Sequence, residues 1–134
     1  MKTALDTRIS RKFRALSEAS ELGLVVYVTA GDPTLDATEK IVLASAKAGA
    51  DVIELGVPFS DPVADGPTIQ RASERALASG TTLESVLGLV KRIRAKSDVP
   101  IVLFSYFNPM LQMGLAKLRP LRPKLARMAC WRRI

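Results

Sequence analysis

Short apolar runs alternate along the chain with segments of helical periodicity. The run 24–30 is continuously apolar and rich in β-branched residues, the run 51–55 is a second short strand, and the run 100–106 is a third. Such runs are typical of strands that are covered on both faces, as in a parallel sheet. We therefore predict three buried strands in the first four-fifths of the chain.

The segments around these runs carry apolar side chains at helical spacing. We predict helices over residues 8–20, from Leu35 to a stop at Gly49, from Pro67 to a stop at Gly80, and after Thr81. Asp32 before Pro33 is expected to cap the helix that follows the first strand, and Thr81 with Glu84 forms a possible capping box.

This succession of strands and helices implies parallel strands joined by crossovers. Two α/β architectures fit it, a doubly wound sheet and a (β/α)₈ barrel. In both, chemistry collects at the carboxyl ends of the strands. The segments at these ends are residues 29–33, 54–66 and 106–108.

Two carboxyl groups stand out in these segments. Glu54 ends an otherwise apolar strand, and apolar surroundings disfavour an ionised carboxyl group, which suits proton exchange near neutral pH. Asp65 lies at the far end of the following loop, where a turn or helix-capping role is the plain alternative. For Glu54 the plain alternative is an ion pair or exposure at the strand end. We interpret the two as a candidate acid/base site.

Other residues are candidates for the surroundings of this site. Tyr27, Phe104 and Tyr106 are expected to line a cavity, although aromatic residues in strands are more often plain core. Asp61 before Pro62 is expected to form a turn or a partner contact, and Asn108 to hold a loop or start a turn. The chain has no histidine and one cysteine, Cys130, so we expect neither a metal site nor a disulfide framework.

One long motif resembles a known family. The run ELGVPFSDPVADGPTIQRA at residues 54–72 is similar to the signature of the tryptophan synthase alpha chain, and the similarity continues in YVTAGDP (27–33), AGADVIELG (48–56) and YFNPM (106–110). It extends from about residue 8 to about residue 116. The resemblance implies the first three strands, with their helices, of a (β/α)₈ TIM barrel.

The resemblance also implies a reaction. The family is a lyase of tryptophan biosynthesis in the cytoplasm that cleaves indole-3-glycerol phosphate to indole and glyceraldehyde 3-phosphate. Glu54 would be the general acid/base, and Asp65 would accept a hydrogen bond from the indole N–H. Tyr27, Phe104 and Tyr106 would border the indole pocket.

The same resemblance implies a partner. The beta chain of tryptophan synthase, which holds pyridoxal phosphate, would receive the indole within an α₂β₂ complex, and no cofactor is expected in this chain. Pro58, Phe59 and Asp61 would lie in the loop that contacts the beta chain, with Asn108 nearby. The family's phosphate-binding loops come late in the barrel and have no counterpart in this sequence.

Charge divides the chain into two parts. Residues 1–116 hold thirteen Lys/Arg and thirteen Asp/Glu, whereas residues 117–134 hold seven Lys/Arg and no acid. We expect residues 1–116 to be the N-terminal part of the barrel domain. Residues 117–134 are expected to be a basic tail outside the fold, produced by a reading-frame shift or a misplaced gene end near Lys117.

Three hypotheses follow. The first is an alpha chain in which Glu54 and Asp65 carry the chemistry, and the second is an inactive fragment of the same family. The third, binding of nucleic acid by the tail, ranks lowest because the basic excess is confined to residues 117–134. No apolar run approaches the length of a membrane-spanning helix, so no membrane partner is expected.

Overall fold

The computed structural model describes residues 6–118 and the backbone of residues 127–131. In chain order the elements are α1 (Arg8–Ala19), β1 (Val25–Thr29), α2 (Leu35–Lys47), β2 (Val52–Gly56), α3 (Pro67–Ala78), α4 (Leu83–Arg94), β3 (Ile101–Tyr106), α5 (Phe107–Met113), α6 (Leu115–Leu118) and β4 (Arg127–Trp131). The three predicted strands and the helices between them are confirmed, with ends that shift by one or two residues.

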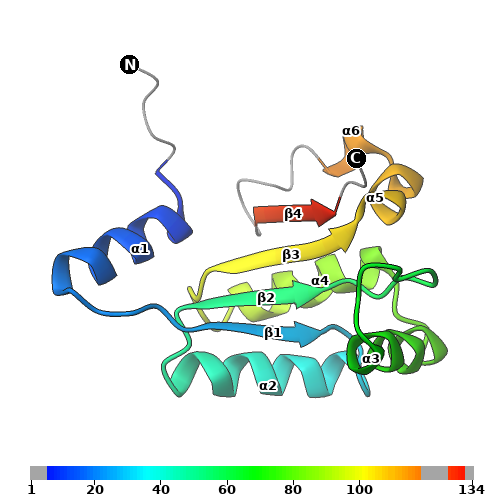
Figure 1. Ribbon diagram of the computed structural model, residues 1–134, viewed down its shortest axis with the longest axis horizontal. Helices are drawn as coiled ribbons and strands as arrows, with labels where there is room; N and C mark the ends of the chain where they lie inside the picture. The colour runs from blue at the N-terminus through cyan, green and yellow to red at the C-terminus, as the bar shows by residue number, and fades with distance from the viewer. Residues whose placement is uncertain (1–5, 119–126, 132–134) are drawn as a thin grey trace.

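The strands form one parallel sheet in the order β1-β2-β3-β4 (Figure 1). A doubly wound sheet reverses its strand order at a switch point, whereas a barrel adds each strand beside the previous one. The unbroken sequential order therefore decides between the two architectures and identifies this sheet as part of a (β/α)₈ barrel.

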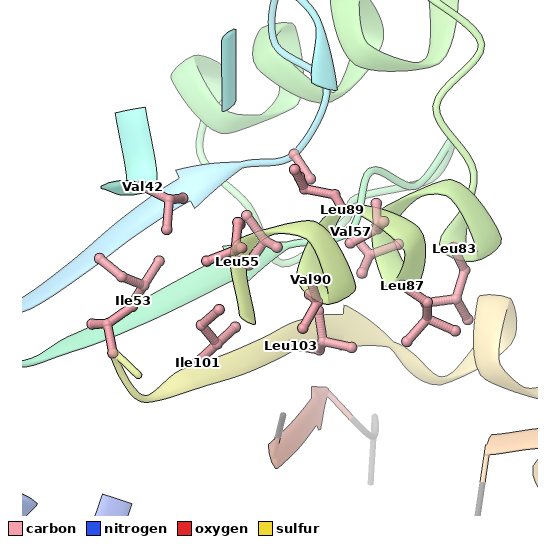
Figure 2. Packing of buried hydrophobic residues seen from close by; sticks show 14 of the residues in the cluster. Val42, Ile53, Leu55, Val57, Leu83, Leu87, Leu89, Val90, Ile101 and Leu103 are labelled. Carbon is pink, nitrogen blue, oxygen red and sulfur yellow. The ribbon is translucent and has the colours of Figure 1, made fainter. Parts of the chain in front are cut away.

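The core lies between the sheet and the helices that follow its strands. Alternate residues of the strands turn toward the helices, and Ile53, Leu55, Ile101 and Leu103 are at most 2% exposed there. They pack with side chains of α2 and α4, among them Val42 (Figure 2). Burial of these aliphatic side chains, at roughly 1.5–3 kcal/mol each, is the main force that fixes the layers.

Helix α1 lies at the amino ends of the strands, away from the β2–α3 loop and α5 (Figure 1). Ion pairs join it to the loops there, from Arg8 to Asp98 at 3.3 Å and from Lys12 to Asp51 at 3.3 Å. The opposite end of the sheet, where the strands end, is left to the loops that carry the candidate residues.

The sheet extends further than the sequence predicts. A fourth strand, β4, pairs with β3 in register Val102↔Arg127 to Tyr106↔Trp131. Leu118, also beyond residue 116, is 2% exposed and belongs to the core. The expectation that everything after residue 116 lies outside the fold is therefore corrected for these residues. A strand that adds to an existing edge gains backbone hydrogen bonds and needs no alternating pattern of its own.

Two predicted helix caps are wrong. The cap of α2 is Thr34 and not Asp32, since the Thr34 hydroxyl accepts from the Ala37 N–H at 3.1 Å. The capping box of α4 is formed by Thr82 and Ser85, one residue beyond the predicted pair. In both places the true cap is the residue with extended backbone immediately before the first helical turn.

Candidate active site

One face of the sheet is left uncovered by the helices, and the register of the strands decides which residues lie on it. Tyr27, Glu54 and Val102 are direct partners across β1, β2 and β3. The next row toward the carboxyl ends contains Thr29, Gly56 and Phe104. Partners in adjacent parallel strands project from the same face, so these two rows and Tyr106 form one surface.

Glu54 occupies the middle of the first row. Its neighbours in sequence, Ile53 and Leu55, are completely buried against the helices. Because strand residues alternate between faces, the Glu54 carboxyl group is directed to the uncovered face, where it is half-buried. The structure thus places it on the inner side of the partial barrel.

Asp65 is brought to the same region by a contact with β3. The Tyr106 hydroxyl donates to Asp65 Oδ2 at 3.1 Å and accepts from the backbone N–H of Ala64 at 2.9 Å. The cap of α3 is Gly66, without a side-chain cap bond, so Asp65 does not serve as that cap. Its carboxylate is turned toward the sheet.

These contacts and the burial of Tyr106 change the pKa of its hydroxyl group. Burial raises the pKa of the Tyr106 hydroxyl, the hydrogen bond from Ala64 lowers it, and the charge of Asp65 raises it again. The net direction is upward, so the phenol stays protonated and able to donate to Asp65 at neutral pH.

The pKa of Tyr27 is affected by the charges of both carboxylates. Its ring packs edge-on against Phe104, with centroids 6.1 Å apart. Burial is the largest cause that raises the pKa of Tyr27, a hydrogen bond from Thr29 lowers it, and the charges of Asp65 and Glu54 raise it further. Both carboxyl groups therefore lie within electrostatic reach of one phenol hydroxyl.

The β2–α3 loop divides the remaining predicted residues. Phe59 packs on Tyr106 with ring centroids 5.1 Å apart, and Pro58 is buried beside it in sequence. Asp61 is exposed and accepts a hydrogen bond from the Ser60 hydroxyl at 2.7 Å. Asn108 lies exposed in the first turn of α5. The structure brings Phe59 to the aromatic residues of the site and leaves Asp61 and Asn108 at the surface.

Comparison with known proteins decides the family. The family described as "Tryptophan synthase alpha chain" matches residues 13–123, a span that contains both candidate carboxyl groups. The chain belongs to the tryptophan synthase alpha chain family. The matched span also continues past residue 116, as the described structure does.

Several members of this family are close in sequence. The tryptophan synthase alpha chain of Citrifermentans bemidjiense is 63% identical over 108 residues, which are 81% of this chain and 40% of the relative. That of Solibacter usitatus is 56% identical over 112 residues, 84% of this chain and 42% of the relative. The chain thus spans about two-fifths of the length of the curated alpha chains that it matches.

Solved structures of the family agree. Tryptophan synthase subunit alpha from Legionella pneumophila superposes with a TM-score of 0.88 at 37% identity, covering 93% of this chain and 48% of that one. Tryptophan synthase from M. tuberculosis, in an aminoacrylate- and BRD0059-bound form, gives 0.87 at 32% identity, covering 96% of this chain and 52% of that one. The described sheet corresponds to about half of the barrel of an alpha chain.

One contact that the sequence did not predict is an ion pair at the carboxyl end of β1. Arg75 of α3 donates two hydrogen bonds to the Asp32 carboxylate, both 2.8 Å long, and these hold the pKa of Asp32 below its usual range. Ser79 donates to the Gly31 carbonyl at 3.2 Å. Together they fix the β1–α2 loop to α3.

The described part of the chain contains neither a metal-ligand cluster nor a membrane-spanning helix. Within residues 6–118 and 127–131, no group of three or more His, Cys, Asp and Glu residues is placed to hold a metal ion. No helix in the same residues is long and apolar enough to span a membrane.

Proposed function

We propose that this chain carries the proton-transferring part of a site that cleaves indole-3-glycerol phosphate to indole and glyceraldehyde 3-phosphate. The observation that supports this most is that Glu54, from β2, and Asp65, from the β2–α3 loop, lie on one face of the sheet: Glu54 is paired with Tyr27, and Asp65 is bonded to Tyr106 of β3. Membership of the alpha chain family supports the choice of substrate.

In the proposed reaction Glu54 acts as general acid and base. It protonates C3 of the indole ring, and the carboxylate that remains accepts the proton of the hydroxyl group on the adjacent side-chain carbon. The bond between C3 and that carbon then breaks, its electron pair returns to the ring, and the oxygen becomes the aldehyde oxygen. Proton transfer by a positioned carboxyl group typically contributes 10²–10⁴-fold in rate.

Asp65 has a separate role in this proposal. Protonation at C3 places positive charge on the ring nitrogen, and a carboxylate that accepts a hydrogen bond from the N–H stabilises that charge. The bond from Tyr106 occupies one oxygen, Oδ2, and in this proposal the other oxygen accepts from the indole N–H. Phe104 and Tyr106 would flank the indole ring.

The partner and cofactor follow from the family. We propose that the loop with Pro58, Phe59 and Asp61, together with Asn108, faces a tryptophan synthase beta chain in the cytoplasm. Asp61 and Asn108 are exposed, as a contact surface requires. The chemistry above uses only carboxyl groups, so this chain would need no cofactor, and pyridoxal phosphate would belong to the beta chain.

A second candidate function is non-catalytic. The chain spans only about two-fifths of its curated relatives, and the resemblance places the family's phosphate-binding loops in the part that it does not match. A site that lacks the phosphate-binding loops binds and positions a phosphorylated substrate poorly. In this alternative the chain binds no substrate productively.

The test of the catalytic role uses a barrel chimera, defined as a full-length alpha chain of a relative whose N-terminal segment is replaced by residues 1–116 of this chain. We expect the chimera to release indole and Glu54→Gln to lower that rate by about 10²–10⁴-fold. Glu74→Gln, on the exposed side of α3, is the matched control. Equal rates for Glu54→Gln and Glu74→Gln would exclude the proposed role of Glu54.

A further inference from the structure

The Tyr27 hydroxyl is held in place from several sides. Its ring lies edge-on against Phe104, and its backbone is paired with Glu54 in the adjacent strand. Burial of this kind restricts a phenol ring to one orientation, because rotation would break the aromatic contact. The hydroxyl group therefore has a defined position on the uncovered face, one strand away from Glu54.

Gly56 determines how close the phenol comes to β2. A Cβ atom at Gly56 would lie 2.1 Å from the Tyr27 hydroxyl oxygen and 2.6 Å from the ring carbon that bears it. Any side chain there would displace the ring. Gly56 is thus required by the position of the Tyr27 hydroxyl, since only glycine leaves the space that this group fills.

Thr29 orients the hydroxyl group. Thr29 is 7% exposed. Its side-chain hydroxyl donates a long hydrogen bond of 3.5 Å to the Tyr27 oxygen. Tyr27 is the acceptor in this contact, so its own proton remains available. Within residues 6–118 no acceptor takes that proton, which leaves it for a group outside the described chain.

We propose that Tyr27 donates a hydrogen bond to the hydroxyl oxygen on the ligand carbon bonded to the indole ring, and that Thr29 and Gly56 are positioning residues for this donor. The inference rests on the proposed function. It assigns a further catalytic residue and a reason for a glycine and a threonine in the second row of the site.

The chemistry of the ligand selects this oxygen. The indole ring offers a donor, its N–H, and no strong acceptor, so a donor beside the ring must serve the glycerol chain or the phosphate. The same oxygen loses its proton in the cleavage, and a donor aimed at it stabilises the negative charge that develops. Tyr27 and Glu54, adjacent in one row, would act on the same hydroxyl group, one as donor and one as proton acceptor.

The acidity of Tyr27 supports this role. Burial, Asp65 and Glu54 together outweigh the Thr29 hydrogen bond and raise the pKa of the phenol. The hydroxyl group therefore remains protonated, and able to donate, through the neutral pH range.

The test compares two ligands by ligand-observed NMR titration of the barrel chimera in its Glu54→Gln background, which slows cleavage: indole-3-glycerol phosphate, and indole-3-propanol phosphate, which lacks both side-chain hydroxyl groups. We expect Tyr27→Phe to weaken binding of the glycerol compound by about 3- to 10-fold and to change binding of the propanol compound by less than about twofold. Thr29→Val should show a smaller effect with the same selectivity, and Thr29→Ser, which keeps the hydroxyl group, should not.

Each outcome is decisive. Equal losses for both ligands in Tyr27→Phe would assign Tyr27 a packing role and overturn the inference while the proposed function stands. No loss for either ligand would also overturn it. If the Glu54→Gln chimera with Tyr27 intact binds neither ligand, the proposed function fails, and the inference fails with it.

Discussion

Tyr27 and Tyr106 each hold a phenol hydroxyl near a carboxyl group of the site, and the chain contains no other tyrosine. Both have a raised pKa, with burial as the largest cause. They differ in what they contact: Tyr106 is bonded to Asp65, whereas Tyr27 is reached by both carboxylates through space. The two phenols therefore report on the arrangement of the charges.

This arrangement predicts a titration. In Tyr106→Phe the remaining phenol is Tyr27, and we expect its pKa to lie above the ordinary value of about 10. Glu54→Gln in that background should lower the pKa of Tyr27, because removing a negative charge makes the phenolate easier to form. Ultraviolet absorbance of the phenolate measures it. If the midpoint of the Tyr27 titration is unchanged in Glu54→Gln and equal to that in Glu74→Gln, the charge of Glu54 does not act on Tyr27.

Asp32 predicts a dependence of stability on pH. Its pKa is lowered in the folded chain by the Arg75 hydrogen bonds. The pair should therefore stabilise the fold above the ordinary aspartate pKa of about 3.9, and this contribution should be lost as the pH falls through the lowered value. In the barrel chimera, Asp32→Asn should reduce the free energy of unfolding at neutral pH and make little difference at the acid end. Equal losses at both pH values would contradict the ion pair.

Single residues were predictable from sequence where the strand itself determines them. Glu54 stands out in the sequence as a carboxyl group at the end of an apolar strand, and its face follows from the burial of Ile53 and Leu55 in the structure. Asp65 was not resolved between cap and site, because its partner Tyr106 is 41 residues away and only the folded sheet joins them. The same holds for Asp32 and Arg75, which are 43 residues apart. Gly56 carried a local signal, a glycine at a strand end, but not the identity of its neighbour.

At the scale of elements, the start of a helix depends on its cap, and the sequence can contain two adjacent residues that are both able to cap. Thr81 and Thr82 are adjacent, and both stand before the apolar face of α4. The structure uses Thr82, with the Ser85 N–H donating to its hydroxyl at 3.2 Å. Thr81 is buried instead, 4% exposed.

The cap predicts a measurable loss. We expect Thr82→Ala to lower the free energy of unfolding of the barrel chimera by about 1 kcal/mol, because a backbone donor of the first turn loses its acceptor. Thr82→Ser keeps an equivalent cap and should be close to neutral. Chemical denaturation measures both. A Glu84→Ala variant that loses as much as Thr82→Ala would favour the cap one residue earlier.

Strands were predictable to within two residues as long as they were apolar on both faces. β4 was not predicted, because Arg127–Trp131 has no strand signature of its own and gains its conformation from the edge of β3. The break in charge at Lys117 therefore does not coincide with the end of the sheet. The origin of the sequence from residue 117 onward in another reading frame remains a prediction. Sequencing of the locus would test it.

At the scale of the molecule, the uncovered face of the sheet is the dominant feature. Val25 on that face is 43% exposed, and Leu24 before it is 55% exposed. In a closed barrel such side chains fill the interior in layers. Here the inner face and the edge strand β1 are open, which favours contact with other molecules.

We accordingly expect the 134-residue chain to self-associate as its concentration rises, whereas the barrel chimera stays at one size. Size-exclusion chromatography with light scattering measures this over a concentration series. If the 134-residue chain remains monomeric throughout, the prediction is wrong, and the open face does not drive self-association.

The central proposal is that residues 1–116 supply the proton-transferring groups of an alpha chain site, and that these groups act only together with the further strands of a closed barrel. Indole release from indole-3-glycerol phosphate, measured side by side for the 134-residue chain and the barrel chimera, tests it most directly. The account predicts release by the chimera, and none by the 134-residue chain above the background of its Glu54→Gln variant. Release by the 134-residue chain that Glu54→Gln abolishes would contradict the claim, because half a barrel would then suffice.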